Sequence, residues 1–98
     1  MSFKIEFTPE VIEDIRSFKK YEQKRIIQEV ENQLTYQPTE ETRNRKKLRP
    51  NQLAEWELRI DKFRVFYDLD IEERRVKIEV VGYKKGNTLF IRGKEYNL

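Results

Sequence analysis

The spacing of apolar residues changes along the chain, and each change indicates where one secondary-structure element ends and the next begins. Residues 2–7 (SFKIEF) alternate, with Phe3, Ile5 and Phe7 on one side, which predicts a half-buried strand. Thr8 and Pro9 then form a helix start, because Thr is a favoured N-cap and Pro fits the first helical position. The chain is therefore expected to pass directly from a strand into a helix.

Two helices are predicted between residues 9 and 36. The first is expected to end near Lys19 and to carry four apolar residues on one face: Val11, Ile12, Ile15 and Phe18. The second is expected from about Glu22 to Tyr36, before Pro38, with its apolar residues at helical spacing: Ile26, Ile27, Val30 and Leu34. The break between the two is short, so the helices should form a hairpin.

After an irregular stretch over residues 37–53, the period returns to two. Residues 56–60 and 63–69 alternate and form a predicted β-hairpin, followed by a polar turn (DIEERR) and a strand through Val76, Ile78 and Val80. Residues 82–87 read as a basic loop, and Leu89-Phe90-Ile91 as an edge strand. The expected fold is α+β in two layers: an N-terminal strand, a two-helix hairpin, then a three- to four-stranded antiparallel sheet with one bare face.

The predicted hairpin brings two arginines together. With Asp61-Lys62 as a two-residue loop, Arg59 lies opposite Arg64, on the face away from the core. Adjacent arginines repel each other unless an anion or carboxylates join them. The pair therefore indicates either a phosphate clamp or a solvated face balanced by Glu55 and Glu57.

Composition narrows the possible chemistry. The 98 residues, expected to form a single domain over 1–98, contain no Cys and no His. Disulfides, Cys nucleophiles, Ser-His-Asp triads and ordinary zinc sites are therefore excluded, and acid–base chemistry must use Glu, Asp, Lys, Tyr or Arg. The acidic residues at 68–73 lack the spacing of a calcium loop, so neither a metal nor another cofactor is expected.

Charge is divided unevenly along the chain. Residues 1–42 sum to −3 and residues 43–98 to +6, which indicates either a polyanionic partner or charge that serves solubility. Five of the seven residues at 43–49 are basic, and they are expected to flank the hairpin face together with the loop YKKGN. Tyr83, Phe90 and Tyr96 are candidates for stacking on bases, with core packing as the alternative for Phe90. No apolar stretch approaches the ~20 residues of a membrane span, and the N-terminus lacks a signal peptide, so a cytoplasmic protein is expected.

The segments LRPNQLAEWELRIDKFRVFYDLD and VKIEVVGYKKGN, with the order of elements over nearly the whole chain, resemble the RelE/ParE superfamily. These are toxins of bacterial type II toxin–antitoxin systems, so the resemblance implies a RelE-like fold and a cognate antitoxin as partner. One branch, similar to RelE, cleaves messenger RNA, usually in the ribosomal A site, without a metal and with the RNA's own 2′-OH as nucleophile. Another, similar to ParE, inhibits DNA gyrase.

The resemblance also implies site residues. Arg64 matches the family's arginine in x-R-V-x-Y, and Lys84 matches its basic residue after V-G-x. With Glu57 as candidate base, these form the predicted catalytic set, and the predicted RNA-binding residues are Arg59, Lys46, Lys47, Arg49, Lys85 and Tyr96. RelE carries catalytic lysines where this chain has Glu55 and Glu57, and a tyrosine where it has Phe90. Three functions stay open: a ribosome-associated endoribonuclease that inhibits translation, a gyrase inhibitor, and a non-catalytic antitoxin-binding module.

Overall fold

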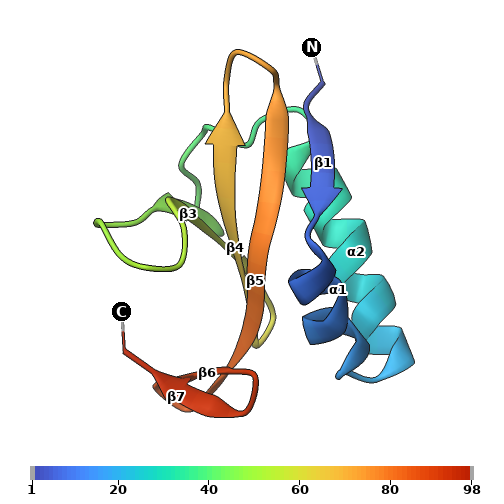
Figure 1. Cartoon of the computed structure of the whole chain (residues 1–98), viewed down its shortest axis with the longest axis vertical. Coiled ribbons are helices and arrows are strands. Elements are labelled where there is room, and N and C mark those ends of the chain that lie inside the picture. Colours follow the sequence, from blue (N-terminus) through green and yellow to red (C-terminus); the bar gives the residue numbers. More distant parts are fainter. Residues whose placement is uncertain (1, 98) are drawn as a thin grey trace.

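The computed structural model of the chain describes residues 2–97, which form two helices and one sheet. Figure 1 shows both helices on the same side of the strands. The elements in chain order are β1 (Lys4–Phe7), α1 (Pro9–Arg16), α2 (Lys20–Leu34), β2 (Arg45–Lys47), β3 (Trp56–Ile60), β4 (Phe63–Asp70), β5 (Arg75–Lys85), β6 (Thr88–Ile91) and β7 (Lys94–Tyr96). The predicted α+β class and element order are confirmed, but the described sheet has seven strands, more than predicted.

Strand β5 is the centre of the sheet. The order is β2-β3-β4-β5-β6-β7 with antiparallel neighbours, and β1 pairs in parallel with the first part of β5. The predicted register of the β3–β4 hairpin is confirmed, with Arg59 opposite Arg64. Asp61 in its loop has a φ of 54°, a conformation that Asp tolerates better than most residues. The extra strands are β2, within the stretch 37–53 that was predicted as irregular, and β7, after the predicted edge strand. Residues 82–85, predicted as part of a loop, continue β5 instead.

The helices follow their sequence signals with shifted ends. The Thr8 hydroxyl accepts a hydrogen bond from the Val11 amide at 3.1 Å, as an N-cap does. Ile12 and Ile27, predicted on buried faces, are 39% and 38% exposed, while the charged Asp14 is buried. Neither helix is long and apolar enough to cross a membrane.

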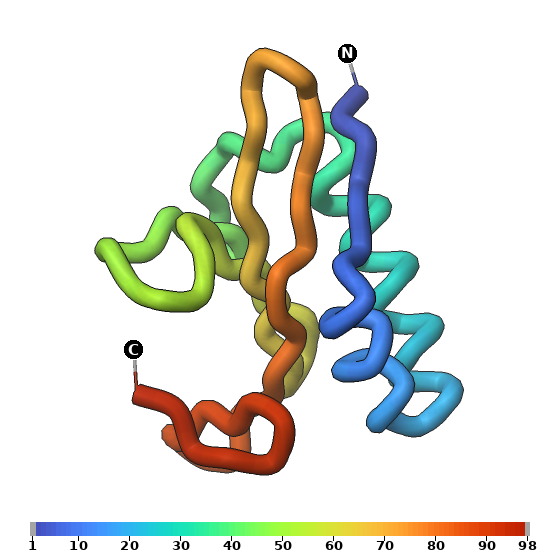
Figure 2. The backbone as a smooth tube through the Cα atoms, viewed as in Figure 1, coloured from blue at the N-terminus to red at the C-terminus, as the bar shows by residue number. Residues whose placement is uncertain are grey.

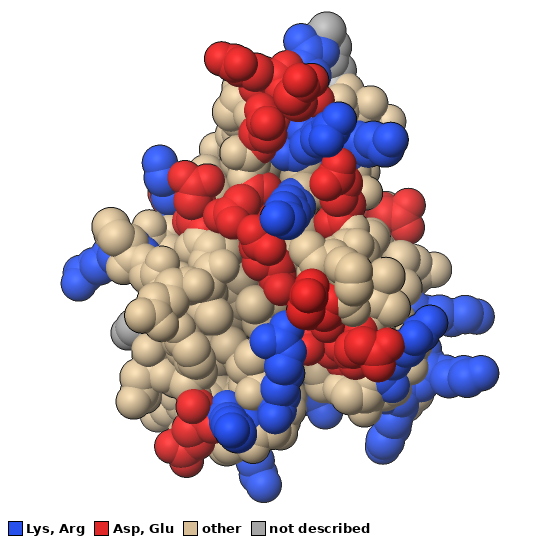
Figure 3. Space-filling model, in the orientation of Figure 1, with Lys and Arg blue, Asp and Glu red and all other residues tan. Residues whose placement is uncertain are grey.

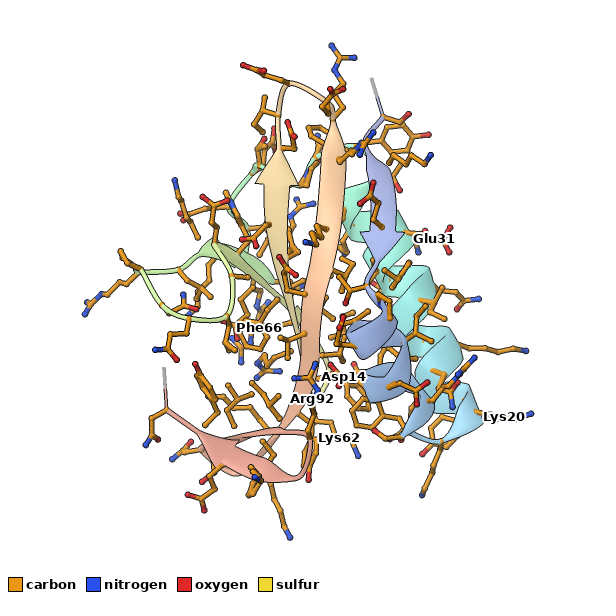
Figure 4. The ribbon with its side chains drawn as sticks, viewed as in Figure 1. Asp14, Lys20, Glu31, Lys62, Phe66 and Arg92 are labelled. Carbon is orange, nitrogen blue, oxygen red and sulfur yellow. The ribbon has the colours of Figure 1, made fainter. Side chains whose placement is uncertain are left out.

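The sheet is packed on both faces. The larger core lies between the helices and one face, and includes Val30, Leu58 and Tyr67. Phe66 is fully buried in a second cluster on the other face, and Figure 4 shows it on the side of β4 away from the helices. The other buried members of that cluster are Ala54, Val80, Leu89 and Ile91. The prediction of a bare face is therefore wrong, because residues 48–54 and the β6–β7 hairpin fold over it.

Gly82 allows this second layer to form. Figure 2 shows the chain bending beneath the sheet as β5 leads into β6. A Cβ atom at Gly82 would lie 2.5 Å from the carbonyl oxygen of Phe90 and 3.0 Å from the side chain of Ile91. Only glycine lets the two backbones approach this closely.

We expect Gly82→Ala to lower the free energy of unfolding by about 1–3 kcal/mol, because the neighbour of the new methyl group is backbone and cannot rotate away. Thermal and urea unfolding measure the change. Gly86→Asn is the matched control: its φ is +62°, which Asn tolerates, and nothing lies within 4 Å of the added Cβ. Equal stability of Gly82→Ala and the wild type would contradict the close approach.

Candidate nucleic-acid interface

A groove of about 800 Å³ lies between residues 46–51 and the β6–β7 hairpin. Figures 1 and 2 show the two segments that line it: the loop that precedes β3, on the left, and the C-terminal hairpin, at the bottom. We call it the basic groove, because six cationic side chains line it: Lys46, Lys47, Arg49, Arg59, Arg64 and Lys84. Its acidic residues are Glu57 and Glu95, so positive charge dominates.

The basic groove brings together eight of the nine predicted site residues: its six cations, Glu57 and Tyr96. They come from β2 to β5, from the residues between β2 and β3, and from β7, which are far apart in the sequence. The ninth, Lys85, does not line the groove. Successive side chains of a strand point to opposite faces, so Lys84 and Lys85 of β5 face in different directions.

Arg64 forms a fixed positive charge at the floor of the groove. Its side chain is only 8% exposed, and its Nη1 donates to the carbonyl oxygens of Asp61 and Phe63, both at 2.9 Å. Burial lowers the pKa of the Arg64 guanidinium, nearby Arg59 lowers it further, and Glu57 opposes both effects. An arginine nevertheless keeps its proton in proteins, so the charge persists.

Glu57 provides the carboxylate that the two opposed arginines require. Its side chain is 7% exposed, with Oε1 3.5 Å from Arg64 Nε and Oε2 3.8 Å from Lys46 Nζ. Glu57 thus compensates the charge of the buried Arg64. Arg59, which lies opposite Arg64 in the hairpin, is exposed. One arginine of the pair is therefore buried beside a carboxylate, and the other is exposed.

Four of the remaining cations of the groove are exposed. Lys46, Lys47, Arg49 and Arg59 are exposed, on long side chains that can adjust to a phosphate backbone. The face drawn in Figure 3 is different, since a band of acidic side chains runs down its middle. The clustered cations of the groove are thus not part of a uniformly basic surface.

The three candidate stacking residues have different surroundings. Tyr83 and Phe90 stack on each other with ring centroids 5.4 Å apart, and Tyr83 also meets Phe18 edge to face at 6.1 Å. Neither lines the basic groove. Tyr96 is half-buried and does line it, so Tyr96 is the aromatic side chain available there.

Sequence reasoning missed two buried charged residues. Asp14 accepts hydrogen bonds from the Val81 amide at 3.2 Å and from Arg92 Nε at 2.8 Å. The sequence does contain a sign of this burial, because Asp14 lies three residues after Val11 and so falls on the apolar face of α1. Arg45, inside the basic run, is 5% exposed, and its Nη1 donates to the Gln33 carbonyl in the last turn of α2. No spacing rule distinguishes it from its exposed neighbours.

Acidic residues also meet beside the groove-forming strands. Glu79 is the extra residue of a β-bulge in β5, opposite the Phe66–Tyr67 step of β4. Burial raises the pKa of the Glu79 carboxyl, and a hydrogen bond with Asp68 raises it further, against the pull of Lys77. Within residues 2–97, no group of three or more acidic side chains is arranged to hold a metal ion.

Comparisons with known proteins give a family by sequence and a similar fold by structure. The family model described as the ParE toxin of the type II toxin–antitoxin system parDE matches residues 5–87. A chain of the toxin–antitoxin complex RelBE2 from Mycobacterium tuberculosis has a similar fold, with a TM-score of 0.75, 20% identity and coverage of 86% of this chain and 100% of that one. A chain of the archaeal RelE–RelB complex from Pyrococcus horikoshii gives a TM-score of 0.65, 18% identity, and coverage of 88% and 98%. No curated protein matches in sequence.

We expect Glu57→Gln to lower the free energy of unfolding by about 3 kcal/mol, because it leaves the buried Arg64 charge without a carboxylate. Lys46→Ala removes the other cation near Glu57, but its side chain is 63% exposed, so a change within about 0.5 kcal/mol is expected. Urea unfolding of both variants measures the difference. Equal effects would mean that Glu57 does not compensate Arg64.

We expect Glu79→Gln to be more stable than the wild type at pH 7, with a difference that shrinks towards pH 4. Folding raises the pKa of Glu79, so its contribution to stability is complete below the pKa of the unfolded state and is lost as pH rises through the folded value. Glutamine does not ionise and escapes this loss. The measurement is the melting temperature of Glu79→Gln and of the wild type between pH 4 and 7. Glu72→Gln, in the exposed β4–β5 turn, is the control. A difference independent of pH would contradict it.

Proposed function

Since this chain belongs to the ParE/RelE superfamily of toxins from type II toxin–antitoxin systems, we propose that it inhibits translation as a metal-independent endoribonuclease that binds messenger RNA in the basic groove. The observation that carries the proposal is the convergence of six cations, a carboxylate and a tyrosine on one groove. A polyanion is the partner that this charge pattern suits.

Binding would rely mainly on the exposed cations. Lys46, Lys47, Arg49 and Arg59 neutralise successive phosphates of a single strand, and Tyr96 stacks on a base. Such binding is largely independent of sequence. It weakens as salt rises, because the release of counterions then contributes less free energy. Sequence preference then depends on the uncharged groups of the groove.

Cleavage would proceed by attack of the RNA's 2′-oxygen on the adjacent phosphorus, with departure of the 5′-oxygen. The products are a 2′,3′-cyclic phosphate and a 5′-hydroxyl, and no metal is needed. Arg64, held by two carbonyls, and Arg59 stabilise the charge that develops on the phosphate. Lys84 is the groove's donor for the leaving oxygen.

Glu57 accepts the proton of the 2′-hydroxyl in this scheme. Its Oε2 is 3.8 Å from Lys46 Nζ, and the Lys46 side chain is 63% exposed. When Lys46 moves to a phosphate, Oε2 becomes available, while Oε1 stays with Arg64. Binding of the RNA would thereby free Glu57 to act as the general base.

The partners follow from the family and the groove. The two similar solved chains come from toxin–antitoxin complexes, which supports a cognate antitoxin for this chain. An acidic or apolar antitoxin segment that covers the basic groove would compete with RNA. The ribosome is the proposed place of action, since it presents messenger RNA as an exposed single strand.

Gyrase inhibition is the second candidate. The specific observation in its favour is that the matching family model is that of ParE rather than RelE. The glutamates at positions 55 and 57, where RelE has lysines, agree with this alternative.

We expect expression of the chain to arrest growth with cleaved messenger RNA, and Lys84→Ala to reduce cleavage by about a hundredfold or more, the usual effect of losing the proton donor to a leaving group. Lys85→Ala is the matched control, because it removes the same charge from the adjacent residue, outside the groove. Primer extension on messenger RNA after induction, and cleavage in a translation extract, measure the effect.

Intact messenger RNA together with inhibited DNA supercoiling by purified gyrase would instead establish the second candidate. Growth arrest unchanged by Lys84→Ala and Arg64→Ala in folded protein, with neither target affected, would contradict both activities.

A further inference from the structure

The basic groove has two chemically different walls. Its cations all come from β2 to β5 and the residues between β2 and β3. The opposite wall, formed by the β6–β7 hairpin and its flanks, contributes Glu95 and the uncharged side chains Asn87, Thr88, Tyr96 and Asn97. Phosphates therefore suit the first wall, and bases, with their π-faces and hydrogen-bonding edges, suit the second.

The base-facing wall is a small hairpin. Strands β6 and β7 contain four and three residues, and β6 pairs with β5 through three residue pairs. A hairpin of this size is only marginally stable by itself. Leu89 and Ile91 of β6 pack in the second cluster, so the start of the hairpin is held by the core. Its far end, at the turn between β6 and β7, is fixed by a separate contact.

Arg92 and Asp14 provide that contact. Arg92 and Gly93 form the turn between β6 and β7, with φ angles of 52° and 79°. Asn-Gly is the favoured pair in such turns, and arginine seldom adopts a positive φ. Here the Arg92 side chain reaches helix α1, where Nε donates to Asp14 Oδ1 at 2.8 Å and Nη2 to Oδ2 at 3.3 Å. Figure 4 shows the two residues together between α1 and the hairpin.

Asp14 ties the hairpin to a rigid part of the fold. Its side chain is 2% exposed, and Oδ2 also accepts the Val81 amide of β5 at 3.2 Å. One buried carboxylate thus holds the helix, the central strand and the hairpin turn. The contact lies on the helix side of the hairpin, in a cleft shared with Ser17 and Tyr83, separate from the basic groove.

We infer that Asp14 and Arg92 are positioning residues, which hold the β6–β7 wall at the distance where Tyr96 stacks on a base of RNA bound in the basic groove. The inference rests on the proposed function, because it concerns the same groove and an RNA ligand. It assigns the phosphate backbone to the β2–β5 wall and the bases to the hairpin wall.

The test uses Arg92→Asn, which removes the ion pair but leaves an Asn-Gly turn that favours the hairpin itself. The control is Arg16→Ala, which removes an ion pair of the same helix, with Glu13 at 2.9 Å, whose side chains are 68% and 70% exposed. The ligand is a fluorescent single-stranded oligoribonucleotide with 2′-O-methyl groups, which blocks cleavage. Fluorescence anisotropy at several salt concentrations gives its affinity.

We expect Arg92→Asn to weaken binding by about tenfold, the size of one lost base–aromatic stack. The slope of log affinity against log salt should stay unchanged, since no phosphate contact is lost, whereas Lys47→Ala should reduce its magnitude by about 0.7. Arg92→Asn and Tyr96→Ala should be non-additive, because both remove the same stack. Amides of residues 88–96 should exchange faster in Arg92→Asn, and those of β3 and β4 should not.

Wild-type affinity in Arg92→Asn, or additive losses with Tyr96→Ala, would overturn the inference. If the wild-type chain itself fails to bind the oligonucleotide, the proposed function fails first. The two failures are thus distinguished by the wild-type measurement, and Arg16→Ala shows whether any ion pair of α1 has the same effect.

Discussion

The backbone pairing of β5 is the constraint on which the rest of the structure depends. This one strand pairs with β4, β1 and β6, and it bends where Gly82 lets the Phe90 carbonyl approach. Its first part, with β1 and the helices, closes the larger core. Its last part carries the C-terminal hairpin beneath the other face, where Phe66 is buried. The groove forms because β5 belongs to the main sheet in its first part and leads into the C-terminal hairpin in its last part.

The charged residues of the groove are of two kinds: buried charges that are paired within the protein, and charges that are exposed to solvent. Arg64 is neutralised by Glu57 and hydrogen-bonded to its own hairpin loop, so its charge is fixed in place. Arg59 and Lys47 remain exposed at the same site. A fixed charge is preorganised and needs no rearrangement during a reaction, whereas mobile charges follow a flexible ligand. Both kinds of charge lie side by side in the groove.

Several features were predictable because they depend on local rules. Alternation fixed the strands over 56–60 and 63–69, and the two-residue loop fixed their register, hence the pairing of Arg59 with Arg64. The motif resemblance selected Arg64 and Lys84, which the structure places in one groove. The bare face was predicted wrongly, because Leu89 and Ile91 look like an edge strand in the sequence and gain their burial only when β6 folds back. Lys85 was included because a loop was expected where β5 continues.

The sequence by itself determined the α+β class, the order of elements and the membership of the toxin superfamily, since these depend on periodicity and motifs along the chain. Only the tertiary structure decided which charges are buried. Asp14 and Arg45 are as polar in the sequence as their exposed neighbours, and each is buried because a partner arrives from a distant segment: Arg92 for Asp14, and the end of α2 for Arg45. Burial of a charge requires such a partner, and a partner far along the chain is a property of the fold.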